Sequence, residues 1–168
     1  MIIGLEPSAV LSFRDEYIRL LPEDPLVKKL ATQSFLIEEF LVNELKEGCF
    51  TSEAFTEEAR SVKVHVHCHQ KAHSNQKITF DLLNAIPNYQ VTLMPTGCCG
   101  MAGSFGYEKE HYDLSMRIGE LKLFKAVRKA PLETLIVANG TSCRHQIKDG
   151  TKRTAMHPVE VLAQALRP

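Results

Sequence analysis

Residues 62–69 read VKVHVHCH, and apolar and polar side chains alternate over the first six positions. Alternation at period two is typical of a β-strand with one buried face. Residues 135–138 read LIVA, an apolar run that predicts a strand buried on both faces. Residues 2–5 and 89–94 also favour strands. These four runs are the expected strands of the fold.

Helical patterns lie between the expected strands. Helices are predicted over 8–21, 25–47, 74–86, 107–127, 141–148 and 158–166, and the polar segment 48–60 is expected to be a loop. Strands that alternate with helices predict an α/β fold: a parallel sheet of about four strands with helices on both faces. The chain shows no internal repeat, low-complexity stretch or linker.

Four of the five cysteines come just after predicted strands. Cys68, the adjacent pair Cys98 and Cys99, and Cys143 follow three successive strands. Because the carboxyl ends of parallel strands meet at one edge of a sheet, we expect these four thiols to lie together there. Cys49 lies at a predicted helix end and is expected to take no part.

Clustered thiols indicate a metal site. Thiolate is a soft ligand, and four of them suffice for one zinc ion or for a [4Fe–4S] cluster. Gly97, Gly100, Gly103 and Gly106 surround the vicinal pair and would let backbone N–H groups approach a bulky anionic centre, which favours iron–sulfur. Zinc stays open as the alternative.

Histidines surround the same cysteines. His67 and His69 flank Cys68, and His145 follows Cys143 by two residues. These imidazoles could donate hydrogen bonds to cluster sulfur and tune its potential. His65 and His67 share one face of the predicted strand, and a core histidine bonded to backbone is the plainer interpretation of either.

Composition excludes several classes of protein. The 168 residues carry 20 basic and 20 acidic side chains, so nucleic-acid binding by a basic surface is not expected. No apolar run approaches the roughly 20 residues of a membrane span. The start of the chain lacks the pattern of a signal peptide. We therefore expect a cytoplasmic protein whose thiols stay reduced.

Three segments resemble a known family. They are HCH at 67–69, GCCGMAG at 97–103 and NGTSC at 139–143. Together they look like the cysteine-rich CCG domain found in subunits of heterodisulfide reductase, glycolate oxidase (its iron–sulfur subunit) and anaerobic glycerol-3-phosphate dehydrogenase. Residues 97–107 and 144–147 are most similar to the C-terminal region of FAD-linked oxidoreductases of the D-lactate and D-2-hydroxyglutarate dehydrogenase type.

The resemblance implies an organisation and a function. Residues 1–168 would be one CCG-type domain at the C-terminal end of a larger oxidoreductase, with 1–60 as the end of a first repeat and connecting helices, and 61–168 as a second repeat. The domain would carry an iron–sulfur centre that receives electrons from FAD on a separate domain or subunit. That partner would oxidise a D-2-hydroxy acid such as lactate, glycolate or 2-hydroxyglutarate. The isolated domain would have no dehydrogenase activity, and partners could hold it peripherally at the inner membrane.

Two positions depart from the family pattern. Ala9 stands where a cysteine commonly follows Glu-Pro-Ser, and Gly140 occupies the first position of the reductase's last Cys-x-x-Cys. Four thiols therefore fit an electron relay better than the reductase's ligand set. A zinc-stabilised or metal-free interaction module and a thiol/disulfide redox domain like heterodisulfide reductase remain as alternatives.

Overall fold

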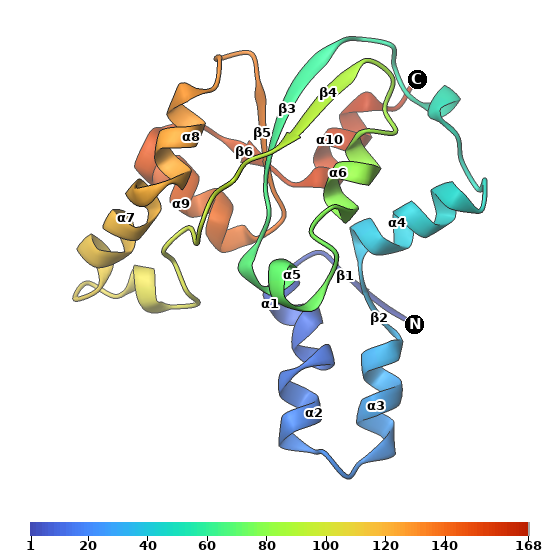
Figure 1. The fold of residues 1–168 in the computed structure, drawn as a ribbon, viewed down its shortest axis with the longest axis vertical. Coiled ribbons are helices and arrows are strands. Elements are labelled where there is room, and N and C mark those ends of the chain that lie inside the picture. Colours follow the sequence, from blue (N-terminus) through green and yellow to red (C-terminus); the bar gives the residue numbers. More distant parts are fainter. Residues whose placement is uncertain (168) are drawn as a thin grey trace.

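The computed structural model describes residues 1–167, and two parallel sheets organise them (Figure 1). The larger sheet has the strand order β4-β3-β5-β6, and all its neighbouring pairs are parallel. Its strands are β3 (Arg60–His65), β4 (Tyr89–Leu93), β5 (Leu135–Ala138) and β6 (Ala155–Met156). The smaller sheet pairs β1 (Ile2–Gly4) with β2 (Ser34–Leu36). The predicted α/β class with a four-stranded parallel sheet is confirmed.

The membership of the larger sheet differs from the prediction in one strand. The run at 2–5 forms β1 of the smaller sheet, and the fourth strand of the larger sheet is β6, only two residues long. No pattern in the sequence marks β6, because a strand of two residues carries no periodicity.

Ten α-helices surround the sheets. They are α1 (Pro7–Val10), α2 (Glu16–Leu20), α3 (Pro25–Thr32), α4 (Ile37–Lys46), α5 (Cys68–His73), α6 (Ile78–Leu83), α7 (Tyr112–Leu121), α8 (Leu123–Lys129), α9 (Thr141–Thr151) and α10 (Pro158–Ala165) in the part that the structure describes, residues 1–167. Three single turns of 3-10 helix lie at Leu11–Arg14, Ser52–Ala54 and Phe105–Tyr107.

The long helices predicted from the pattern are shorter in the structure. The expected helix 25–47 is interrupted by β2, which pairs with β1 and breaks the helical run at Gln33. Pairing with a distant strand here outweighs local helical preference. The expected helix 8–21 likewise breaks into α1, a 3-10 turn and α2. The helix expected over 74–86 forms only as α6, and the separate short helix α5 was not predicted.

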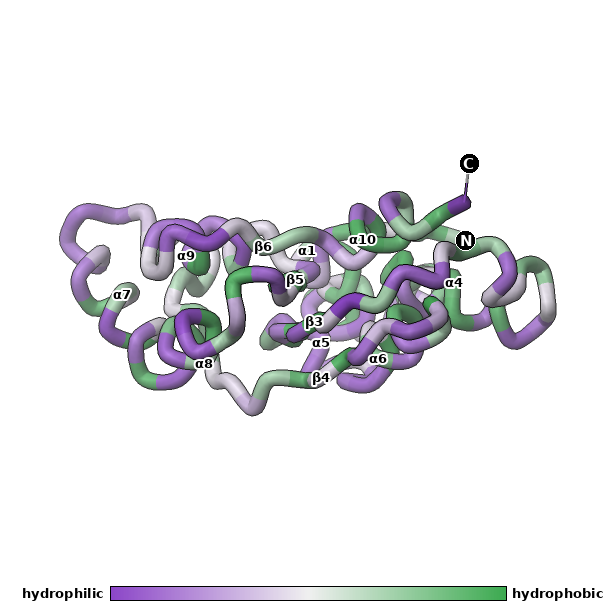
Figure 2. The backbone as a smooth tube through the Cα atoms, turned by 90° about the horizontal axis from the view of Figure 1, so that it is seen from above, coloured by the Kyte–Doolittle hydropathy of each residue, from purple (hydrophilic) through white to green (hydrophobic). Residues whose placement is uncertain are grey.

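The larger sheet separates two apolar cores. On one face, Val62 and Val64 pack with helices α4, α6 and α10. On the other face, Ile136 and Ala138 pack with α8 and α9 around Phe124. Seen from above, the strands run between these two groups of helices (Figure 2). Both faces are thus covered, as a parallel sheet requires.

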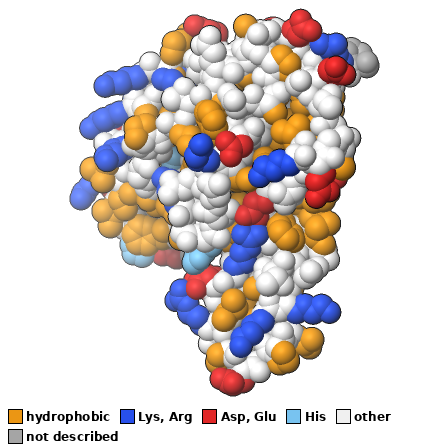
Figure 3. All heavy atoms as spheres, turned by 45° about the vertical axis from the view of Figure 1, so that its right-hand side comes forward, with side chains coloured by type: hydrophobic (Ala, Val, Ile, Leu, Met, Phe, Trp, Pro, Cys, Tyr) orange, Lys and Arg blue, Asp and Glu red, His pale blue; other side chains and the backbone are white. Residues whose placement is uncertain are grey.

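Helices α2 and α3 form a hairpin that projects from the rest of the molecule (Figure 1). Leu20 and Leu26 are 74% and 69% exposed there, and Figure 3 shows hydrophobic side chains on the surface of this projection. The core beneath it is small and consists of Val10, Leu11 and Leu36. Within residues 1–167, no helix has the length and apolar character to cross a membrane.

Candidate functional site

The four cysteines that follow predicted strands line a single cavity of about 670 Å³. Cys68 comes from the start of α5, Cys98 and Cys99 from the loop after β4, and Cys143 from the first turn of α9. Cys99 and Cys143 are buried, whereas Cys68 and Cys98 are partly exposed. The expected convergence of these thiols at the carboxyl edge of the sheet is therefore a feature of the structure.

Two local features set the position of Cys98 and Cys99. Gly100 has φ +98°, a left-handed conformation that glycine adopts without strain. Its N–H donates to the Cys98 Sγ at 3.3 Å, and its carbonyl accepts from the Ser115 hydroxyl at 2.8 Å. A methyl group at Gly100 would lie 2.1 Å from the backbone oxygen of Ser115. The vicinal pair is thus fixed by a turn that lies against α7.

The predicted histidines lie in different positions around the cavity. His67 and His69 both line it. His67 is not in the strand, as the alternating pattern implied, because β3 ends at His65. Its Nδ1 instead accepts from the His69 N–H at 3.1 Å and caps α5. His145 is exposed and bonds through Nδ1 to the Tyr107 hydroxyl at 2.6 Å, and Tyr107 lines the cavity.

The pKa values of the four thiols shift in alternating directions. Hydrogen bonding from Cys68, then from Cys99, holds the pKa of Cys98 well below its usual range. Hydrogen bonding with Cys99 lowers the pKa of Cys143, despite its burial. The same contacts raise the pKa of Cys68, through Cys98, and of Cys99, through Cys143. Each thiol with a lowered pKa therefore has a hydrogen-bonded neighbour with a raised pKa, and an ion that binds all four sulfurs as thiolates must displace protons.

The spacing of the sulfur atoms tests the fit of a single zinc ion. Ligands on a tetrahedral zinc with bonds of about 2.3 Å lie about 3.8 Å apart. Among residues 1–167, no three of these four thiols lie within 4.8 Å of one another. As arranged, the sulfurs are too widely spaced for one zinc ion.

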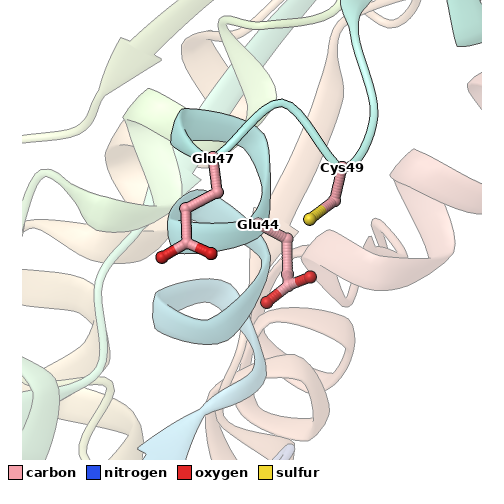
Figure 4. Close-up of side chains that lie close together, drawn as sticks. All are labelled: Glu44, Glu47 and Cys49. Atoms are coloured by element: carbon pink, nitrogen blue, oxygen red, sulfur yellow. The ribbon is translucent and has the colours of Figure 1, made fainter.

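Cys49 lies apart from the cavity, with Glu44 and Glu47 at the C-terminal end of α4 (Figure 4). Their ligand atoms lie within 4.8 Å of one another. Hydrogen bonding to Glu44 raises the pKa of the exposed Cys49 thiol. Two solvated carboxylates beside one thiol are common on protein surfaces, and the group shares no residue with the cavity.

Sequence reasoning missed Glu6 and expected His65 only as a core histidine. Glu6 lines the cavity, and its Oε2 accepts from the Thr141 N–H at 2.7 Å, so it stabilises the N-terminus of α9 from 135 residues away. His65 is fully buried and lies beside Cys143. Nothing in the local pattern marks Glu6, because its partner is remote in the sequence. Period two did place His65 on one face of a strand.

Comparison with known proteins shows that the relatives of this chain are dehydrogenases. The chain is 31% identical over 98% of its length to a subunit of the anaerobic glycerol-3-phosphate dehydrogenase of Escherichia coli. It is 28% identical over 99% of its length to D-2-hydroxyglutarate dehydrogenase of the same organism, and 29% identical over 97% to that of Pseudomonas putida.

The relatives are longer proteins. The chain spans 40% of the glycerol-3-phosphate dehydrogenase subunit, and 16% and 15% of the two D-2-hydroxyglutarate dehydrogenases. No protein-family model matches the chain, and no solved structure matches it. The chain therefore corresponds to a part of larger dehydrogenase proteins and is rich in cysteine.

Proposed function

We propose that this chain is the electron-transfer domain of a flavin-dependent oxidoreductase, and that Cys68, Cys98, Cys99 and Cys143 hold a [4Fe–4S] cluster. The observation that supports this most strongly is the convergence of four thiols from three turns on one cavity of about 670 Å³. Four thiolates match the ligand requirement of the cluster. Within residues 1–167, no three of these sulfurs lie within 4.8 Å of one another, so they do not form the closed ligand set of a single zinc ion.

When bound, such a cluster accepts and releases single electrons. The chain's own residues hold the sulfurs and compensate their charge. The Gly100 N–H stabilises the Cys98 thiolate, and the N-terminus of α9 brings partial positive charge to Cys143. His67 and His69 line the cavity and are able to donate ring N–H groups to sulfur. His145 would act through Tyr107, and Gly97 would give the loop before the vicinal pair its freedom to turn.

The proposed partner is a flavin-containing domain or subunit that oxidises a D-2-hydroxy acid such as lactate, glycolate or 2-hydroxyglutarate. The names of the relatives support a dehydrogenase, and several name 2-hydroxyglutarate. FAD would lie on that partner, so the 168 residues alone are expected to show no dehydrogenase activity. The thiol ligands must stay reduced to bind iron, which favours the cytoplasm, either free or held at the inner membrane by partners.

We also propose that residues 1–60 end a first CCG-type repeat and that residues 61–168 form a second. Two pairs of strands, each followed by a helix, support this. In β1–β2 and in β5–β6 the strands are parallel, and each pair leads into a helix, α4 or α10. Both helices begin alike: the third residue, Glu39 or Glu160, accepts from the N–H of the residue before the helix, at 2.9 and 2.6 Å.

The proposal is tested by iron and acid-labile sulfide analysis after anaerobic reconstitution. Cys68→Ala, Cys98→Ala, Cys99→Ala and Cys143→Ala should each lower both contents several-fold, because each removes a ligand. Cys49→Ala is the matched control and should bind as much as the parent chain. Equal iron and sulfide in all five variants would refute the ligand assignment. Stoichiometric zinc without sulfide would support a structural zinc module instead.

A thiol/disulfide redox domain is the second candidate, and the environment of Cys98 favours it. Its thiol is partly exposed, its pKa is lowered, and the Cys68 thiol interacts with it directly. This arrangement is typical of reactive cysteines. The alternative predicts rapid alkylation of Cys98 alone in metal-free protein, which also binds no iron with sulfide. Slow alkylation of every thiol would exclude it.

A further inference from the structure

His65 lies where the three cysteine-bearing segments meet. It is the last residue of β3, three positions before Cys68, and none of its surface is exposed. Its ring contacts Thr96, which lies two positions before Cys98, and it also lies beside Cys143 in α9. We propose that His65 is a positioning residue, which holds these segments together and donates its Nε2–H to the Cys143 sulfur. This inference rests on the cluster proposed above.

The Thr96 contact anchors the loop that carries the vicinal cysteines. His65 Nδ1 lies 2.7 Å from the Thr96 hydroxyl oxygen. Lys71 Nζ donates to the Thr96 carbonyl at 2.7 Å. His65 and Lys71 lie on either side of Cys68 in the sequence. The segment around Cys68 therefore makes two hydrogen bonds to Thr96, at the start of the loop that carries the vicinal cysteines. A shift of either segment would break both hydrogen bonds.

The proposed bond to sulfur fixes which ring nitrogen carries the proton. The Thr96 hydroxyl oxygen lies 2.7 Å from His65 Nδ1 and 3.4 Å from the Met94 carbonyl oxygen. A sulfur bound to the cluster carries no proton, so Nε2 pairs with it only as a donor, and Nδ1 of the neutral ring then accepts from the Thr96 hydroxyl. A neutral imidazole with Nδ1 as acceptor carries its hydrogen on Nε2.

The Nε2–H of His65 needs an acceptor. Nε2 is buried and has no hydrogen-bond partner among residues 1–167. A buried donor without a partner is costly, and most such groups are paired in native proteins. Cys143 is itself buried, packs in the core on one face of the sheet and lies beside His65. Donation from Nε2 to a Cys143 thiolate bound to the cluster would satisfy both groups.

Long-range proton–nitrogen NMR on the reduced, metal-free chain tests the tautomer. The ring of His65 should show a protonated Nε2 and an unprotonated Nδ1. Thr96→Val removes the hydroxyl that sets this tautomer, and the protonated-Nε2 form should fall at least several-fold relative to the other tautomer. A His65 ring protonated on Nδ1 in the parent chain would overturn the inference, whatever the outcome of reconstitution.

Two substitutions at His65 then separate positioning from simple packing in reconstituted protein. His65→Asn keeps an acceptor near Nδ1 but has no group at Nε2, whereas His65→Gln keeps a donor near Nε2. A hydrogen bond to sulfur stabilises the reduced centre, so the Asn variant should shift the one-electron equilibrium about tenfold towards oxidation, or about 59 mV. The Gln variant should stay near the parent potential. Equal shifts in both variants, or none in either, would contradict the proposal. Failure of the parent chain to bind iron and sulfide would count against the cluster, and the NMR result would still decide the role of His65.

Discussion

At the scale of single residues, the most unusual group away from the thiols is Glu38. Its side chain is fully buried in α4. Oε1 accepts from the Asn139 amide at 3.0 Å, while Oε2 has no partner among residues 1–167. Burial raises the pKa of Glu38 to about 7, in spite of the hydrogen bond from Asn139. Because Asn139 follows β5 just before the Cys143 helix, a charge at Glu38 lies beneath the carboxyl edge of the sheet.

Glu38→Gln should make the folded state less sensitive to pH. The folded pKa of about 7 lies above the ordinary value of 4.5, so the folded chain holds a proton that the unfolded chain releases. This contribution to stability is complete below pH 4.5 and is lost as the pH rises to 7. At about 1.4 kcal/mol for each pKa unit, the loss is about 3 kcal/mol. In urea unfolding, the free energy of unfolding of the variant relative to that of the parent should therefore rise by about 3 kcal/mol between pH 4.5 and about pH 8.

The exposed Glu133→Gln provides the control for this series, and its stability should follow that of the parent across the same range. A difference between Glu38→Gln and the parent that does not change with pH would show that folding leaves the pKa of Glu38 unchanged.

At the scale of elements, the loop after β4 is the part whose shape the site requires most. Gly100→Ala should destabilise the fold by about 3 kcal/mol, because it combines a left-handed conformation with a methyl group 2.1 Å from the Ser115 oxygen. Gly97→Ala is the matched control. Its added carbon meets no described atom within 4 Å, so its stability should change by less than about 0.5 kcal/mol. Urea midpoints of the two variants that coincide would disprove this account of the turn.

The elements also show how far the sequence determines the site. Cys68, Cys98, Cys99 and Cys143 could be brought together from the sequence, because parallel strands deliver their following turns to one edge. The strand β2 could not be found, since residues 34–36 continue a helical pattern and become a strand only through pairing with β1. Glu6 escaped detection, because its partner Thr141 is remote in the sequence. His65 was expected as a core histidine, but its place beside Cys143 depends on a remote contact that the local pattern does not show.

At the scale of the whole molecule, the two sheets differ in how well they are supported. The larger sheet lies between two apolar cores, whereas the smaller one rests on the cluster of Val10, Leu11 and Leu36. Ile2 and Ile3 of β1 are each 40% exposed, whereas Ile136 and Val137 of β5 are buried. The segments that follow β1 and β5 meet at the cavity, where Glu6 bonds to Thr141. A second contact, between His157 and the Leu5 carbonyl, lies outside the cavity. A centre at this junction would tie the smaller sheet to the larger one.

X-ray absorption at the iron edge of the anaerobically reconstituted chain tests the central claim most directly. We predict that each iron is surrounded by sulfur and that a second shell of iron neighbours is present, because the four thiols hold a cluster and not a single ion. Iron bound mainly by oxygen or nitrogen, or sulfur ligation without iron neighbours, would contradict the account.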